Sequence, residues 1–124
     1  MKMTHRYIYI IGISFLVLLP VSCGQKHKAA SLADDFVERY ALQPEQLTDR
    51  DYCHFDSTHR LNDSLVAELQ QQHKPLFKKD IPYPAPKAGR MLYLIRMNYT
   101  SGGDDTLVHT FYIDEHMQHI VAFK

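Results

Sequence analysis

The last third of the chain constrains the fold most, because it consists of short alternating segments separated by turn residues. Residues 91–100, 106–113 and 119–123 alternate between the two faces of a strand and are rich in aromatic and β-branched types. Residues 101–104 and 114–118, which separate them, contain the glycine and aspartate residues typical of turns. Strands joined by tight turns pair with their neighbours, so the pattern predicts a three-stranded antiparallel meander.

Both faces of this predicted sheet carry apolar side chains. In its first strand, Tyr93 and Ile95 point to one face, whereas Leu92 and Leu94 point to the other. Neither face can therefore be fully exposed to water. We expect helices to cover one face, and we expect the proline-rich segment, a second copy of the chain or a ligand to cover the other.

Two amphipathic helices are predicted upstream of the sheet. The first begins at Ser31, which can cap it with Asp34 in the capping-box position, and it ends before Pro44. Its apolar stripe comprises Leu32, Phe36, Val37 and Tyr40. The second helix begins after its expected cap, Asn62, and ends before Pro75. Its stripe comprises Leu61, Leu65 and Leu69, and Leu61 and Val66 occupy the positions of a hydrophobic staple.

Two further segments complete the predicted order of elements. Residues 51–56 form a short aromatic segment that suits a strand. Residues 75–86 contain four prolines and favour an extended connection across the domain. The order α-β-α-β-β-β predicts an α+β fold, with two helices packed on an antiparallel sheet of three to four strands. Residues 31–124 are long enough for a single domain and too short for two.

The N-terminal segment has the composition of a removable export leader. Lys2 and Arg6 precede an apolar run, residues 8–21, which is shorter than the roughly 20 residues that a membrane-spanning helix needs. The run leads to a serine followed by Cys23, and a small residue before a cysteine resembles the lipobox of bacterial lipoproteins. Pro20 departs from that pattern, because it stands where the family usually has leucine.

This resemblance implies a signal peptide over residues 1–22, acylation of Cys23, and a short polar tether over residues 23–30. The partner of the anchor would be a lipid bilayer. No acidic residue directly follows Cys23, which favours a position on the outer membrane facing the periplasm. Cleavage would leave Cys53 as the only free thiol, and we expect it to be buried. The remaining charge is close to neutral without a basic stripe, so we expect no nucleic-acid partner.

The element order also resembles the cystatin-like and NTF2-like α/β rolls, in which a curved sheet wraps a long N-terminal helix. The whole chain resembles small lipoproteins of the Bacteroidetes type, through Cys23 and the segments 55–58, 62–65 and 111–114. That resemblance implies O-glycans at Asp-Ser or Asp-Thr motifs, here at Ser57, Ser64 and Thr106. The same motifs are ordinary turn and helix-cap chemistry. The Gln-x-Val-x-Gly inhibitory loop of the cystatins is missing.

Histidines and a cysteine raise the question of a metal site, but their predicted positions do not converge. His116 lies in a predicted turn, whereas His119 starts a strand. Cys53 and His54 would point to opposite faces of their strand, with His59 beyond its end. Zinc needs three or four convergent ligands, so we predict no metal and no cofactor.

His109 is the most informative candidate side chain. It shares one predicted sheet face with Leu107, Phe111 and Ile113, and a polar group there requires a partner. A hydrogen-bonded histidine is favoured over a catalytic base at such a position. The sequence contains no Gly-x-Ser-x-Gly elbow, phosphate loop, His-Glu-x-x-His or Cys-x-x-Cys motif. We therefore predict no catalytic residues.

These observations favour a non-enzymatic envelope module that binds a small ligand, a peptide or a partner protein. Tyr93, His109 and Phe111 are its candidate pocket residues, since aromatic side chains with polar tips suit binding surfaces. Two alternatives stay open. One is a structural or accessory subunit, or a homodimer, that buries the uncovered sheet face. The other is an enzyme that uses His109 as an acid or base in an NTF2-like pocket.

Overall fold

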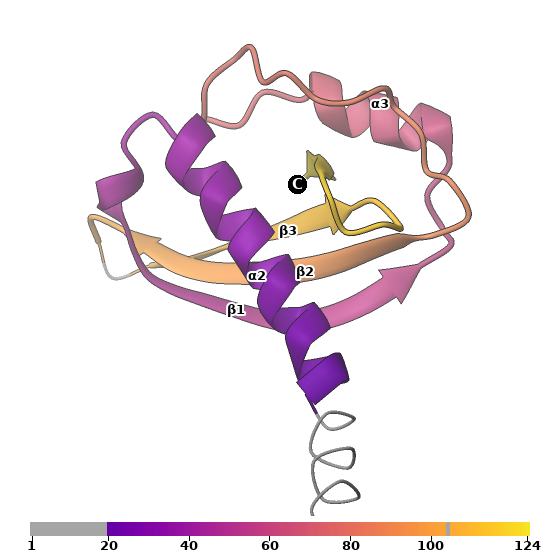
Figure 1. Cartoon of the computed structure of the whole chain (residues 1–124). Helices are drawn as coiled ribbons and strands as arrows, with labels where there is room; N and C mark the ends of the chain where they lie inside the picture. The colour runs from indigo at the N-terminus through magenta and orange to yellow at the C-terminus, as the bar shows by residue number, and fades with distance from the viewer. Residues whose placement is uncertain (1–19, 104) are drawn as a thin grey trace, which may run out of the picture.

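A four-stranded antiparallel sheet forms the centre of the fold, with one helix lying across it and another beside its last strand (Figure 1). The computed structural model describes residues 20–103 and 105–124, with side chains from residue 24 onward. Residues 1–19, most of the predicted leader, lie outside the described residues. The elements are α2 (Pro20–Tyr40), the 3-10 turn η1 (Pro44–Gln46), β1 (Leu47–Thr58), α3 (Asp63–Gln71), β2 (Leu92–Ser101), β3 (Thr106–Ile113) and β4 (Ile120–Phe123). The predicted α+β class and the order α-β-α-β-β-β are confirmed.

The sheet is a meander, because its strands pair in the order β1-β2-β3-β4. β2 and β3 pair without interruption, from Tyr93 opposite Ile113 to Thr100 opposite Thr106. Gly102 lies in the turn between them with a φ of 67°, a conformation that glycine adopts without steric cost. The three predicted C-terminal strands are therefore confirmed, with β4 joined to β3 by the predicted turn.

β1 is longer than the predicted segment 51–56 and forms one edge of the sheet. Its pairing with β2 is interrupted twice, and each interruption contains a non-glycine residue with positive φ: Asp49 at 54° and His54 at 53°. Such bulges bend a strand and increase its twist. Together with the acidic side chains on β1, they disfavour pairing of this edge with another chain.

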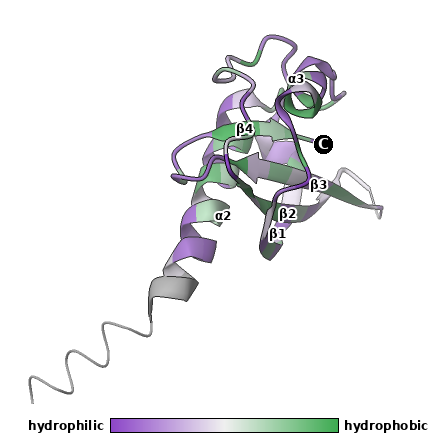
Figure 2. Ribbon diagram, turned by 90° about the vertical axis from the view of Figure 1, so that its right-hand side faces the viewer, coloured by the Kyte–Doolittle hydropathy of each residue, from purple (hydrophilic) through white to green (hydrophobic). Residues whose placement is uncertain are grey.

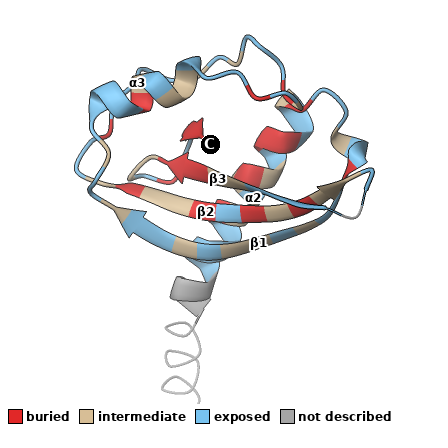
Figure 3. Cartoon of the chain, turned by 180° about the vertical axis from the view of Figure 1, so that it is seen from behind, coloured by how far each residue is buried: buried red, intermediate tan, exposed pale blue. Residues whose placement is uncertain are grey.

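The sheet face under α2, here called the inner face, carries the main core. Ile95 of β2 lies opposite Phe111 of β3, and neither has exposed surface. Val37 of α2 is equally buried and belongs to the same cluster. Figure 3 shows buried residues in red on α2, β2 and β3. Full burial of side chains of this size contributes about 1.5–3 kcal/mol each. The same cluster includes Ala29, Ala33, Phe36, Phe77, Met97, Tyr99, Ile113 and Phe123.

The opposite face, here called the outer face, is covered at one end. Tyr112 pairs with Ala122, and Val66 of α3 packs into the same cluster. Farther from α3 this face is open, since Val108 is 50% exposed and Cys53 is half-buried. The expectation of a covered second face thus holds only near α3. The expectation of a buried Cys53 is wrong, because the described helices pack elsewhere.

α2 begins at Pro20 and not at Ser31, so the predicted start of this helix is wrong. Ser31 lies exposed within the helix, and Ala29 and Ala33 are fully buried against the sheet. Alanine favours helix and allows the helix to approach the strands closely. The helix therefore continues through residues 24–30, which we predicted to be a tether (Figure 2).

α3 begins where the sequence predicts it. The Asn62 side chain accepts a hydrogen bond from the backbone N–H of Leu65 at 2.9 Å, which is the expected cap. Leu61 packs in the same cluster as Val66, as a hydrophobic staple requires. The predicted stripe is wrong at Leu65, which is 39% exposed, because the buried side of this helix centres on Val66.

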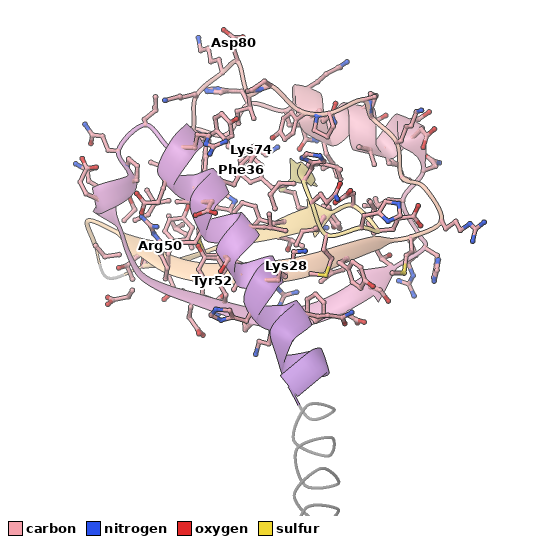
Figure 4. The ribbon with its side chains drawn as sticks, viewed as in Figure 1. Lys28, Phe36, Arg50, Tyr52, Lys74 and Asp80 are labelled. Carbon is pink, nitrogen blue, oxygen red and sulfur yellow. The ribbon has the colours of Figure 1, made fainter. Side chains whose placement is uncertain are left out.

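A polar network joins α2 to β1. Asp34 Oδ1 accepts hydrogen bonds from the Tyr52 hydroxyl at 2.8 Å and from Arg50 Nη1 at 2.9 Å. The same Arg50 nitrogen donates to Glu38 Oε1 at 2.7 Å, and the arginine also donates to two backbone carbonyls of β1 and η1. Figure 4 shows Arg50 and Tyr52 close to α2. Burial, followed by the bond to Asp34, raises the pKa of Tyr52, so its hydroxyl remains a donor.

The substitution Asp34→Asn is expected to lower the free energy of unfolding by about 1–2 kcal/mol, because it removes the charge that pairs with the largely buried Arg50. Urea unfolding followed by circular dichroism measures the loss. Asp35→Asn is the matched control, since Asp35 is exposed and makes no bond in this network. Its effect should stay within about 0.5 kcal/mol. Equal losses in the two variants would contradict the role assigned to the network.

Candidate functional site

Two clefts adjoin one another beside the proline-rich segment that connects α3 to β2. The first has a volume of about 220 Å³. The C-terminal half of α2 contributes Phe36 and Arg39 to its wall, and the proline-rich segment contributes Tyr83. The Phe36 and Tyr83 rings stack with their centroids 6.0 Å apart. Asp35 and Arg39, one helical turn apart, place opposite charges at the mouth of this cleft.

The second cleft is mainly apolar and has a volume of about 320 Å³. Leu92 at the start of β2 and Val121 of β4 line it, and Ala85 comes from the proline-rich segment. Lys87 and His116 add cationic and hydrogen-bonding groups to the lining. An apolar cleft with a few polar groups is the usual form of a small-molecule site.

Pro84 and His119 line both clefts and therefore mark the boundary between them. The turn before β4 positions His119, because Asp114 Oδ1 accepts hydrogen bonds from the backbone N–H groups of Gln118 at 2.7 Å and His119 at 2.9 Å. Met117 adopts a φ of 54° in this turn and buries its side chain in the core. His119 thus lies in a turn whose conformation is fixed by these hydrogen bonds.

Side-chain hydrogen bonds hold the proline-rich segment in place. Gln70 of α3 donates from Nε2 to the carbonyl oxygens of Pro84 at 3.1 Å and Val121 at 2.9 Å. Asp63 Oδ1 accepts the backbone N–H of Ala88 at 2.8 Å. These hydrogen bonds from α3 hold the proline-rich segment next to β4. They thereby fix the wall that this segment contributes to each cleft.

The lining groups offer both charge and hydrogen bonding. Burial raises the pKa of Tyr83, so its hydroxyl stays protonated and can donate to a ligand in the first cleft. In the second cleft, Glu115 Oε1 lies 3.6 Å from His116 Nε2. Lys87, which is exposed, also lines this cleft. The second cleft therefore combines an apolar surface with acidic and cationic groups, since Asp114 and Glu115 line it as well as Lys87 and His116.

The predicted pocket residues lie on the inner face and do not line either of the two clefts. Phe111 is fully buried and stacks on Phe123 with centroids 5.3 Å apart. Tyr93 is half-buried and stacks on Phe55 at 5.5 Å. Neither they nor His109 line the two clefts or a third one of about 270 Å³ near Leu42. The sequence pointed to the inner face, whereas the clefts lie beside the proline-rich segment.

His109 is held by hydrogen bonds at both ring nitrogens. Nδ1 donates to the carbonyl oxygen of Lys124 at 3.2 Å, so Nε2 of the neutral ring accepts from the Tyr99 hydroxyl at 2.8 Å. Its ring also meets Phe77 edge-to-face at 5.4 Å. Burial lowers the pKa of His109, the Lys124 carbonyl acts against this, and the nearby charge of Lys74 lowers it further. These contacts favour a structural histidine, the interpretation preferred from sequence.

The remaining candidate residues do not form a metal site. Within the described part of the chain, no three His, Cys, Asp or Glu side chains are placed to bind a metal ion. His59 Nδ1 instead lies 2.8 Å from the Arg90 carbonyl oxygen. Ser57, Ser64 and Thr106 are all exposed, as a glycan would require, and their modification stays a prediction.

Comparison with protein-family models, curated proteins and solved structures finds no match to this chain. None of the helices in the described residues has the length and apolar character needed to cross a bilayer.

Stability should fall as pH decreases below the ordinary histidine pKa of 6.5. In this pH range His109 binds a proton in the unfolded chain, but its lowered pKa keeps it neutral in the folded chain. Acid therefore favours unfolding until the pH falls below the pKa of His109 in the folded chain. Urea unfolding at about pH 7.5 and about pH 5 measures this dependence. His109→Gln should reduce it, while His73→Gln, at an exposed position, should not. An unchanged dependence in His109→Gln would contradict the assignment.

Proposed function

We propose that this protein is a membrane-anchored lipoprotein of the bacterial envelope, whose domain binds a small amphiphilic ligand or the side chains of a peptide. The observation that carries the binding role is the pair of adjoining clefts that share Pro84 and His119. The anchor would be acyl chains on Cys23, after removal of residues 1–22. The outer membrane, facing the periplasm, is the proposed location.

Two features support the anchor. The sequence around Cys23 resembles a lipobox, and residues 24–28 are all exposed, so the chain directly after the cysteine is not part of the core. The first fully buried side chain in the described region is Ala29. Several acyl chains on one cysteine would hold the protein firmly on a bilayer, since each buried CH₂ contributes about 0.8 kcal/mol.

The chemistry of the second cleft supports a ligand with an apolar body and a negative group. Leu92 and Val121 provide an apolar lining. Two carboxylates also line the cleft, but Asp114 accepts the backbone hydrogen bonds of its own turn and Glu115 lies beside His116. Lys87 is the lining cation that we propose to bind the ligand. A carboxylate or sulfonate could pair with the lysine while the rest of the ligand displaces water from the apolar surface. The resemblance to cystatin-like and NTF2-like rolls, which rests on element order and on the curved sheet around α2, is compatible with this role (Figure 1).

The alternative functions have less support. A homodimer or accessory subunit would use the open part of the outer face, where Val108 is the prominent apolar group and Arg96 is exposed. An enzyme that uses His109 would need to release one of its two hydrogen bonds, to Tyr99 or to Lys124. The clefts need no such rearrangement, and they remain the preferred site.

Anilinonaphthalene sulfonate, an apolar probe with one negative charge, is expected to bind the second cleft, and its fluorescence measures the dissociation constant. Lys87→Ala should weaken binding roughly two- to fivefold, because it removes a solvent-exposed charge partner. Ala85→Phe should abolish binding by filling the cleft. Lys79→Ala is the matched control, since Lys79 is exposed and lies outside the clefts. Equal binding by all four proteins would contradict the assignment.

The anchor has a separate test. Mass spectrometry of protein purified from bacterial membranes should find a chain that begins at Cys23 and carries fatty acids. Cys23→Ser should release the protein into the soluble fraction, whereas Cys53→Ser should leave it in the membrane. Protein that retains Met1, or that carries no fatty acid, would contradict the proposed anchor. The proposed ligand binding in the clefts would be unaffected, because the fluorescence measurement tests it separately.

A further inference from the structure

Helix α2 connects the proposed lipid anchor to the core without a break. Its backbone is helical from Pro20 to Tyr40, and this range includes Cys23. Ala29 and Ala33 of the same helix are fully buried against the inner face. From residue 23 to Ala29 the helix rises about 9 Å, at about 1.5 Å per residue. The anchor is therefore separated from the core by less than two turns of helix, and not by a flexible linker.

We propose that α2 is a stalk that holds the domain upright on an anionic bilayer, with β1 nearest the lipid and α3 farthest from it. This inference rests on the proposed acylation of Cys23 and adds an orientation to it. Three views agree that the N-terminal end of α2 projects beyond the β1 side of the sheet, while α3 lies on the opposite side (Figures 1, 2 and 3).

The charges on the stalk suit anionic headgroups. Lys26 and Lys28 are both exposed, and Figure 4 shows Lys28 on the N-terminal half of α2. Their positions along the helix lie within about 8 Å of residue 23, which is comparable with the Debye length at physiological salt. Each lysine close to such a surface improves binding by about fivefold. The unsatisfied N–H groups at a helix N-terminus add partial positive charge at the same end.

The charges on β1 keep the sheet edge from lying flat on the same surface. Asp49, Asp51 and Asp56 are exposed along this strand. Anionic headgroups attract the stalk and repel the strand. β1 is therefore the strand nearest the bilayer but does not lie on it, and the domain stands on its helix. The first cleft, lined by the C-terminal half of α2, then lies away from the anchored end of the helix.

Fluorescence quenching in vesicles of phosphatidylethanolamine and phosphatidylglycerol tests this orientation. The acylated full chain, with Cys53→Ser, receives one label through Ser57→Cys on β1 or through Asp80→Cys, which Figure 4 places far from the N-terminal end of α2. A quencher on the lipid headgroups should reduce the Ser57→Cys signal several times more than the Asp80→Cys signal. Equal quenching at the two positions would overturn the proposal.

A control isolates the rigidity of the stalk. A flexible Gly-Ser insertion after Gly24 should make the two labels equally sensitive to the quencher while acylation is unchanged. Amide hydrogen exchange of residues 26–30 should show helical protection in the uninserted protein, and unprotected amides would overturn the stalk. Mass spectrometry on the same samples separates the two proposals. If Cys23 carries no acyl chains, the proposed anchor is wrong. If it carries them, the quenching pattern tests the orientation alone.

Discussion

The packing of α2 across the inner face is the contact on which the other features depend. Ala29 and Ala33 let the helix approach the strands closely, and Phe36 fills the space beyond them against Phe111 and Phe123. The network around Arg50 then holds the helix to β1. Because Phe36 also forms a wall of the first cleft, the position of this helix decides whether the cleft exists.

Local patterns explain which parts of the fold the sequence could predict. The alternation in residues 91–123 and its turns correctly gave β2, β3 and β4, and Asn62 gave the start of α3. β1 was only partly predicted, since its acidic residues and its two bulges at Asp49 and His54 hide the alternation. The start of α2 was missed because small alanines, and not large apolar residues, form its buried stripe before Phe36.

The clefts could not be predicted from sequence, because they depend on contacts between distant segments. Gln70 brings Pro84 to the edge of β4, and Asp114 fixes the turn that carries His119. No local sequence motif predicts either contact. The sequence did identify His109 as a polar group that needs partners, and the structure supplies them in Tyr99 and the Lys124 carbonyl. Periodicity thus located the inner face but not the clefts.

One helix serves three purposes that are usually distributed over separate elements. Its buried side completes the core, its C-terminal half lines the first cleft, and its N-terminal half leads to the proposed anchor. The helix couples these roles mechanically, because an α2 anchored as proposed could not tilt on a bilayer without moving Phe36 and the rest of the domain. The alanines that let the helix pack closely on the sheet would therefore also fix the orientation of the first cleft relative to the proposed anchor.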